Sequence, residues 1–580
     1  MVTPCFVGRA LRLDTVVVFV SVMLWAHLWS MVGMLVATPL LVVVRTVCER
    51  IPALRPVSAF LSGRGVEAEG PERQGREPRP RLPPRGPQAR SGPRPAAPRG
   101  PRSGIRPADW RIPRRPRHPS GDPRLPRAAA WAMLRPTEGG PPMPPLPPRL
   151  EMRLDERGPV RVGVIGAGKF ASMFLNQVPS SPHLSVVALA DLDPARARKA
   201  LADVGWSEER IAAVEIGGDG MAVIAHPEVE VVLEVTGSPA AGCAHALAAA
   251  ERGVSVVMVN VEADVLAGPV LAAAHARAGT VYSMAYGDQP ALVAELVDWA
   301  RVSGFEVVAA GKGTRYQPFY HDVGPDGVWD HYGLTAEEAH GAGMNPQMFC
   351  SFLDGTKSAI EMAAIANATG LAVPREGLAF PPVGTGALAD RLIPRRDGGV
   401  LETAGMVEVV ASAERGAQAE LADHLRWGVY VVFEAPNAYA RGCFAQYGLR
   451  TDASGRYAAL WRPYHLIGLE LGVSVVRAAL GEPTGAPRDW VGDVAAVAKR
   501  DLAAGETLDG EGGACAWGRL MPAGRSLEAR ALPIGLAHGV RLRRAVAHGA
   551  TITRDDVETP PETAATLARA EMEATAKPVG

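Results

Sequence analysis

Cysteine and lysine are both scarce in this chain of 580 residues. None of the six cysteines forms a C-x-x-C pair with another; they are Cys5, Cys48, Cys243, Cys350, Cys443 and Cys515. This scatter excludes a zinc-ribbon or disulfide-framework protein and agrees with a reducing compartment. Only six of the 61 basic residues are lysine. Because a lysine ammonium can change its pKa where an arginine guanidinium cannot, each retained lysine is a candidate for chemistry.

Charged side chains are absent from residues 15–44, an apolar run long enough to span a bilayer. Residues 51–150 are about a quarter proline and a fifth arginine, which predicts disorder. Residues 1–150 are therefore interpreted as a membrane anchor with a basic cytoplasmic tether, or as an extension from a start codon assigned upstream of Met143 or Met152. The second interpretation is favoured. Both leave the catalytic part cytoplasmic, with membrane contact only if residues 15–44 are expressed.

The arginine-rich extension hides the charge of the rest of the chain. Residues 1–150 hold 24 basic and 9 acidic side chains, which leaves 37 basic and 52 acidic ones, a net charge of about −15, in the remainder. Such an acidic body is not expected to bind nucleic acid. Its length allows two or three domains.

A dinucleotide-binding motif begins the globular part. Residues 160–171 read VRVGVIGAGKFA, a predicted strand followed by G-x-G-x-x-A and a helix. Gly166 allows the tight turn, Gly168 lets the backbone approach a pyrophosphate, and Ala171 lets the helix pack closely on the strand. Lys169 and Phe170 lie inside the same loop. The motif predicts an NAD(P) site.

The choice between NAD and NADP stays open at the next strand. The predicted strand 184–190 ends at Asp191, where an acidic residue takes the ribose hydroxyls of NAD. Arg196, in the following turn, could instead hold the 2′-phosphate of NADP.

Polar residues follow three further predicted strands, at residues 229–235, 254–259 and 281–285. In an open parallel sheet, ligands bind at these carboxyl ends, although each residue could also be a helix cap. The residues are Thr236, Gly237, Asn260, Glu262, Asp264 and Asp288.

Two lysines in apolar surroundings are candidates for polarising a carbonyl group or donating a proton. Lys312 follows a predicted strand at 305–310. Lys357 lies in a nearly continuous predicted helix from Pro346 to about residue 371. Asp354 and Glu361 have the spacing that would place them on the same helix face as Lys357, which predicts either a structural ion-pair stripe or an active-site wall.

Several long strings carry a family resemblance, namely GAGKFASMFL, EVTGSPAAG, VMVNVEADVLAGP, AAGKGTRY and MNPQMFCSFLDGTKSAIEMAAIANATGL. Over residues 150–560 the chain resembles the homoserine-dehydrogenase-like oxidoreductases with a C-terminal SAF domain, especially their 1-deoxy-D-xylulose 5-phosphate reductoisomerase-like members. The resemblance implies a homodimer with NADP(H) along the motif loop and at Asp191, Thr236, Gly237 and Asn260. It also implies an Asp–Lys pair that would be Asp354 and Lys357 here.

The predicted fold class is α/β. We expect a Rossmann domain over 158–300, an α+β catalytic and dimerisation domain over 301–490, a SAF (β-clip) domain over 491–560 and a loose tail over 561–580.

The function that the resemblance implies is NADP-dependent reductoisomerisation of a small phosphorylated ketose such as 1-deoxy-D-xylulose 5-phosphate, a step of isoprenoid precursor synthesis. Lys312 or Lys357 would stabilise the oxyanion, while Asp288, Glu262 or Asp354 would move protons or hold a divalent cation. Arg450, Arg456 and Arg462 are candidates for the substrate phosphate. The alternatives are a homoserine-type or hydroxy-acid dehydrogenase and an NAD(P)-sensing binding protein.

Overall fold

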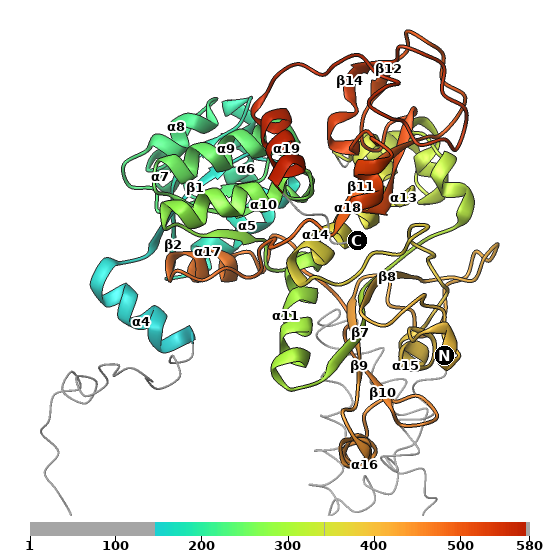
Figure 1. The fold of residues 1–580 in the computed structure, drawn as a ribbon. Helices are drawn as coiled ribbons and strands as arrows, with labels where there is room; N and C mark the ends of the chain where they lie inside the picture. The colour runs from blue at the N-terminus through green and yellow to red at the C-terminus, as the bar shows by residue number, and fades with distance from the viewer. Residues whose placement is uncertain (1–145, 342, 576–580) are drawn as a thin grey trace, which may run out of the picture. The chain divides into compact units, whose positions relative to one another are not determined.

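The computed structural model describes residues 146–341 and 343–575 (Figure 1). The apolar segment 15–44 and the expected disorder up to residue 145 lie outside this range. Among the described residues, no helix has both the length and the apolar character needed to cross a membrane. Residues 146–150, expected to belong to the extension, start helix α4 (Leu146–Arg157). This helix packs on the first domain through Leu150 and through an Arg153–Glu230 ion pair of 2.8 Å.

The first domain is the predicted Rossmann domain. Its sheet has six parallel strands in the order β3-β2-β1-β4-β5-β6, and the strands are rich in valine because helices cover both faces. The strands are β1 (Val160–Ile165), β2 (Leu184–Ala190), β3 (Glu215–Gly217), β4 (Val231–Glu234), β5 (Ser255–Met258) and β6 (Tyr282–Met284).

Two apolar clusters cover the two faces of this sheet. One involves α5 (Lys169–Gln177), α6 (Pro194–Asp203), α7 (Glu208–Ala212) and the late helix α17 (Gly472–Ala479). The other involves α8 (Gly220–Ala225), α9 (Pro239–Glu251) and α10 (Val261–Ala278). Helix α10 begins at Val261 because Asn260 caps it: the Asn260 Oδ1 accepts from the Ala263 N–H at 3.1 Å.

The second domain is built on a mixed four-stranded sheet in the order β10-β9-β7-β8. The strands are β7 (Glu306–Thr314), β8 (Met406–Ala411), β9 (Val429–Glu434) and β10 (Tyr457–Arg462). Helices α11 (Gln289–Val302) and α14 (Thr356–Thr369) pack against it, and α12 (Ala336–Gly341), α15 (Leu388–Arg391) and α16 (Ala438–Gln446) lie in its connections. Strand β7 continues past residue 310, so Lys312 lies within the strand rather than after it.

The expected continuous helix after Pro346 is wrong, because two helices form instead. Helix α13 (Pro346–Leu353) stops at Asp354, and Gly355 has φ +88°, a left-handed conformation that glycine adopts without strain. Helix α14 then begins at Thr356 as a separate helix. Asp354 therefore does not share a helix face with Lys357 and Glu361.

The SAF domain follows as two antiparallel ribbons. Strand β11 (Gly492–Ala498) pairs with β13 (Ala516–Pro522), and β12 (Thr507–Asp509) pairs with β14 (His538–Arg541). Helix α18 (Ala523–Glu528) follows β13. The α/β, α+β and SAF architecture expected from the sequence is confirmed.

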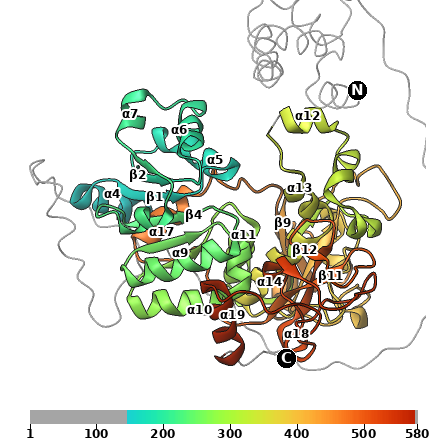
Figure 2. The same cartoon turned by 90° about the horizontal axis from the view of Figure 1, so that it is seen from above.

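The end of the described chain is helical instead of loose. Helix α19 (Ala564–Thr575) buries Ala565, Ala568 and Met572, which lie on one helical face. This face packs against α9 and α10 of the Rossmann domain, as both views show (Figures 1 and 2).

A buried ion pair ties α19 to the SAF domain. Arg569 donates to both carboxylate oxygens of Asp493, at 2.9 and 2.6 Å, and its guanidinium lies 4.7 Å from the ring centroid of Trp490. Ser526 Oγ donates to the same carboxylate. Burial by itself raises the pKa of Asp493, but Arg569 and these hydrogen bonds lower it overall.

We predict that Arg569→Met lowers the free energy of unfolding by about 3–5 kcal/mol, because Asp493 stays buried without a counter-charge. The loss should be full at neutral pH and shrink on acidification, since the pair stabilises only the ionised carboxylate. Chemical denaturation monitored by circular dichroism measures it. The control is Arg396→Met, whose exposed side chain lies 3.4 Å from Asp397. Equal losses in the two variants would contradict the prediction.

Candidate active site

A cavity of about 860 Å³ lies at the carboxyl edge of the Rossmann sheet. All three domains contribute to its lining, through the Rossmann loops, the α13–α14 region and the SAF domain. Residues 560–566, which follow the SAF domain, also line it. Eight of the predicted cofactor residues and one predicted catalytic lysine line it. They are Gly168, Lys169, Phe170, Arg196, Thr236, Gly237, Asn260, Glu262 and Lys357.

The phosphate loop fits a dinucleotide. Gly166 has φ +107°, and a Cβ there would lie 2.8 Å from the Val235 carbonyl oxygen, so the turn requires glycine. At Gly168 nothing lies within 4 Å of a Cβ position, and this open space lies on the cavity wall at the N-terminus of α5. The backbone can therefore approach a pyrophosphate beside unpaired helix N–H groups. Ala171 is fully buried behind the loop.

Asp191 is part of the loop architecture and does not line the cavity. Its carboxylate accepts from the Ala167 N–H at 2.8 Å and from the Asp193 N–H at 2.9 Å, and the Arg196 guanidinium lies 2.7 Å from both oxygens. Burial raises the pKa of Asp191, but these hydrogen bonds outweigh it and lower the pKa. Arg196, with a side chain 59% exposed, is the member of the pair that faces the cavity.

The loop after β4 is held by polar contacts. Thr236 Oγ1 donates to the buried Glu234 at 2.6 Å, and His245 Nδ1 lies 3.1 Å from the same oxygen. Asn260 Nδ2 donates to the Ser238 carbonyl at 2.8 Å, which ties this loop to the start of α10. Thr236 and Asn260 thus shape the cavity wall as well as line it.

Two lysine–carboxylate pairs lie on one face of α14. Lys357 Nζ donates to Glu262 Oε1 at 2.5 Å, across the gap to α10. One turn further, Glu361 accepts from Lys312 of β7. Asp288 lies nearby at the N-cap of α11, where it accepts from the Gln289 N–H. Positive and negative charges therefore alternate through the site.

These charges shift one another's pKa values. Burial opposes the charge on Lys357, but Glu262, Glu361, Glu511 and Asp288 outweigh it and raise the pKa, so the ammonium keeps its proton. Burial and repulsion from Glu361 raise the pKa of Asp288 to about 7. Lys357 is thus suited to hold a negative oxygen and not to give up a proton.

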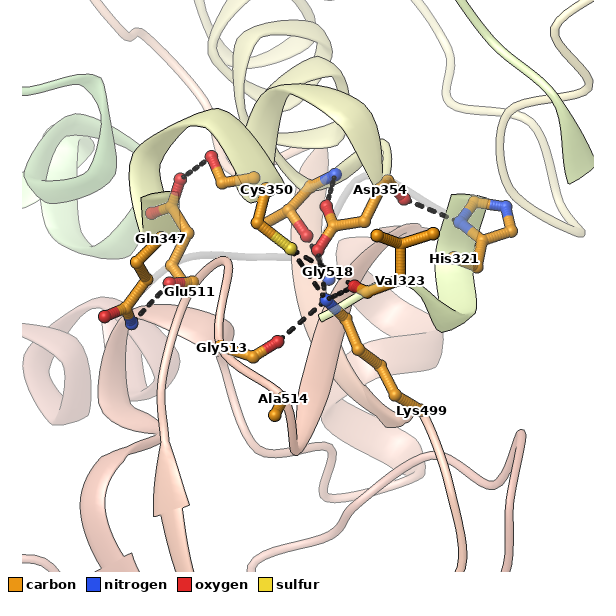
Figure 3. Close-up of polar contacts among 12 residues, drawn as sticks. His321, Val323, Gln347, Cys350, Asp354, Lys499, Glu511, Gly513, Ala514 and Gly518 are labelled. Carbon is orange, nitrogen blue, oxygen red and sulfur yellow. Dashed lines mark hydrogen bonds and ion pairs between the residues drawn. The ribbon is translucent and has the colours of Figure 1, made fainter. Parts of the chain in front are cut away.

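The other predicted catalytic residues do not line the cavity. Lys312 and Asp288 are buried, Lys312 in its pair with Glu361 and Asp288 among the charges of Glu361 and Lys357. Asp354 is fully buried and lies 2.8 Å from Lys499 (Figure 3). The three candidate phosphate-binding arginines are also outside the lining: Arg456 pairs with Glu434 and Asp397, Arg462 pairs with Glu470, and Arg450 is exposed.

Sequence reasoning missed the residues that the SAF domain and α13 add to the cavity. Glu511 comes from the β12–β13 loop, and Gln347 and Ser351 come from one face of α13. Ser351 Oγ donates to Glu511 Oε1 at 2.8 Å. The only local signal is the string DGEGG around Glu511, in which glycines flank a single acid.

Side chains suited to a divalent cation do not gather at this site. Within residues 146–341 and 343–575, no three His, Cys, Asp or Glu side chains form a metal-binding group. Glu262 and Glu361 are already neutralised by lysine.

Three family models match consecutive parts of the chain. Residues 160–259 match the oxidoreductase family with an NAD-binding Rossmann fold, the GFO/IDH/MocA oxidoreductases. Residues 287–471 match the catalytic domain of oxidoreductase DRL, and residues 493–558 match the SAF domain. A search of curated proteins finds no match.

Among solved structures, a probable dehydrogenase from Thermotoga maritima is similar with 14% identity and a TM-score of 0.30, over 56% of this chain and 90% of that one. Biliverdin reductase from Synechocystis sp. PCC 6803, with biliverdin and NADP⁺, has 20% identity and a TM-score of 0.21 over 27% of this chain and 48% of that one. A 3-ketoreductase from Actinomadura kijaniata, with NADP, has 18% identity and a TM-score of 0.20, over 28% and 50%.

The Rossmann loop, the cavity and the family models together define the class of this protein. It is an NAD(P)-dependent oxidoreductase, and three successive parts of it match the models of the GFO/IDH/MocA Rossmann domain, the DRL catalytic domain and the SAF domain. The enzyme class expected from the sequence is confirmed.

We predict that Gly168→Val weakens NADPH binding by more than about tenfold, or about 1.4 kcal/mol, because the valine side chain enters the space in which the pyrophosphate would lie. The backbone φ of Gly168 is −77°, a value that any residue can adopt. The free energy of unfolding should therefore stay within about 0.5 kcal/mol of wild type. Fluorescence titration with NADPH measures the affinity.

Gly217→Val is the matched control, since a Cβ there also meets nothing within 4 Å but the residue does not line the cavity. Equal NADPH affinity in the two variants would mean that the dinucleotide binds elsewhere.

Proposed function

We propose that this protein uses NADPH to reduce the carbonyl group of a small, polar, sugar-like substrate. The observation that carries the proposal is that the Lys357 ammonium and the dinucleotide loop line the same cavity. The first substrate to test is a phosphorylated ketose, 1-deoxy-D-xylulose 5-phosphate, in a reductoisomerase reaction that the sequence resemblance implies. In that reaction the carbon skeleton rearranges to an aldehyde before it is reduced.

Lys357 would hold the substrate oxygen. Its raised pKa keeps it cationic, and an ammonium at that oxygen stabilises the negative charge that develops when a carbonyl carbon accepts hydride. Glu262 orients the ammonium at 2.5 Å. Bound at the loop, NADPH would supply the hydride.

The lining residues in and next to α13 support a polar substrate. Asn345, Gln347 and Ser351 add amide and hydroxyl groups to the cavity lining, beside the apolar Met348 and Phe352. Such a wall can bind the hydroxyl groups of a polyol and one apolar edge of its carbon chain. The cationic lining residues in the described part of the chain are Lys169, Arg196 and Lys357, and Lys169 lies at the phosphate loop.

Arg196 supports NADP over NAD. The carboxylate of Asp191 is turned to loop N–H groups, while the guanidinium of Arg196 reaches the cavity. We predict that Arg196→Ala raises the Kd of NADPH by about tenfold or more, the loss of one charge-assisted hydrogen bond, and leaves NADH binding nearly unchanged. Paired fluorescence titrations measure both. A parallel loss for both dinucleotides would show that Arg196 acts only through Asp191.

We predict that Lys357→Ala lowers kcat for NADPH oxidation by about 10²–10³-fold, as the loss of an oxyanion donor does. The affinity for NADPH should stay near that of wild type. The assay follows NADPH absorbance with 1-deoxy-D-xylulose 5-phosphate, with and without Mg²⁺ or Mn²⁺. Lys199→Ala, which removes an exposed lysine with a side chain 72% exposed, is the matched control.

Three outcomes separate the alternatives. Turnover that Lys357→Ala abolishes supports the reductoisomerase reaction. Turnover only with homoserine-like alcohols or hydroxy acids would replace the substrate and keep the site. Tight NADPH binding without turnover of any substrate would favour a sensing protein.

A further inference from the structure

The SAF domain places one acidic side chain in the cavity. Glu511 lies in the loop between β12 and β13 and lines the cavity together with Lys357 and Glu262. Its carboxylate accepts a hydrogen bond from Ser351 Oγ at 2.8 Å. An acid from a distant domain thus reaches the wall that holds the ammonium.

The loop that carries Glu511 is fixed by α13. Gln347 Nε2 donates to the carbonyl oxygens of Asp509 and Glu511, at 2.9 and 2.8 Å, and Figure 3 shows Gln347 beside Glu511. Gly512 has φ +66°, and a Cβ there would lie 2.0 Å from the Gln347 carbonyl oxygen. Only glycine therefore allows this close approach, and the loop cannot move away without losing both hydrogen bonds.

A buried lysine holds the other end of the loop. Lys499 Nζ donates to the carbonyl oxygens of Gly513 and Val323, at 2.8 and 2.7 Å, and lies 2.8 Å from Asp354 Oδ2 (Figure 3). Both members of the ion pair are almost fully buried, with side chains 1% and 0% exposed. Asp354 and Lys499 are therefore positioning residues for the loop.

Burial and two neighbouring carboxylates favour the protonated form of Glu511. Burial and repulsion from Glu262 and Asp354 raise its pKa, whereas Lys357 and the Ser351 hydroxyl lower it, and the result is a pKa of about 8. His538 of β14 also lines the cavity. At neutral pH a carboxylic acid therefore lies on the same wall as an ammonium that keeps its proton.

We propose that Glu511 is a catalytic residue: the SAF domain supplies the general acid that protonates the substrate oxygen held by Lys357. This inference rests on the proposed carbonyl reduction. It gives the SAF domain a direct part in the chemistry, and it makes Ser351, Gln347 and the Asp354–Lys499 pair the framework that aims the acid.

The step balances without any further reactant. Hydride from NADPH forms a C–H bond at the carbonyl carbon, and the π pair of the C=O bond becomes a lone pair on the alkoxide oxygen. The O–H bond of Glu511 breaks as its proton bonds to that oxygen, which yields the alcohol and NADP⁺. The Glu511 carboxylate then takes a proton from water. A general acid of this kind contributes about 10²–10⁴-fold in rate.

The first test needs no turnover. Infrared difference spectra of the full chain are recorded between pH 6 and pH 9.5, a window around the pKa of about 8. Wild type should lose a protonated-carboxyl C=O band with a midpoint near pH 8, and this band should be absent in Glu511→Gln. The other buried acids have a pKa of about 7, so they should lose their bands nearer pH 7, and equally in both proteins; they are Asp264, Asp288 and Glu408. Superimposable spectra would overturn the proposal.

The second test measures kcat against pH for carbonyl reduction. In wild type kcat should fall as pH rises through about 8, because the protonated acid is the active form. In Glu511→Gln, kcat should drop by about 10²–10⁴-fold and no longer fall as the pH rises through about 8. The affinity for NADPH should stay near that of wild type. Glu511→Asp keeps an acid on a shorter side chain, so its kcat should again fall as the pH rises, from a lower maximum than in wild type. Glu558→Gln changes an exposed glutamate of the same domain and should behave as wild type.

The results separate the two proposals. Equal kcat values for Glu511→Gln and wild type overturn the assignment of Glu511 and leave the proposed function standing. Failure of wild type to oxidise NADPH with every carbonyl substrate overturns the proposed function, and the assignment with it.

Discussion

The pairing of two lysines with carboxylates on one face of α14 is the constraint on which the site depends. Lys357 with Glu262 joins α14 to α10 and so links the catalytic domain to the Rossmann domain, while Lys312 with Glu361 joins α14 to β7 within the catalytic domain. An isolated charge in these surroundings would cost several kcal/mol, and removal of either partner leaves the other uncompensated. The geometry between cofactor loop and substrate wall is therefore set by electrostatics as well as by packing.

The same network divides the chemical tasks between residues. Carboxylates around Lys357 raise its pKa, and burial, together with repulsion from neighbouring carboxylates, raises the pKa of Asp288 and Glu511. One group is thereby kept charged and others are kept protonated near neutral pH. Separation of pKa values in this way allows one site to polarise an oxygen and to deliver a proton.

Local pattern was sufficient for the Rossmann domain and insufficient for the site. Strand β2 begins and ends at the predicted residues, and Gly168 of the motif loop lines the cavity, because alternation and turn chemistry are local properties. The apolar run around Asp354 outweighed the one local sign of the break, the Asp354-Gly355 dipeptide, which is a turn signal. Glu511 could not be placed, because its approach to Lys357 depends on tertiary contacts between residues 154 positions apart, a separation that the numbering itself gives. The burial of Arg569 was missed for the same reason.

The return of α19 to the first domain has a consequence for synthesis of the chain. The Rossmann strands end at Met284, yet the apolar surface of α9 and α10 is covered only when residues 564–575 arrive. At about 5–20 residues per second, the ribosome needs roughly 15–60 s to make the intervening chain. During that time the nascent Rossmann domain exposes this apolar surface. Chaperones and other nascent chains can therefore bind it until α19 covers it.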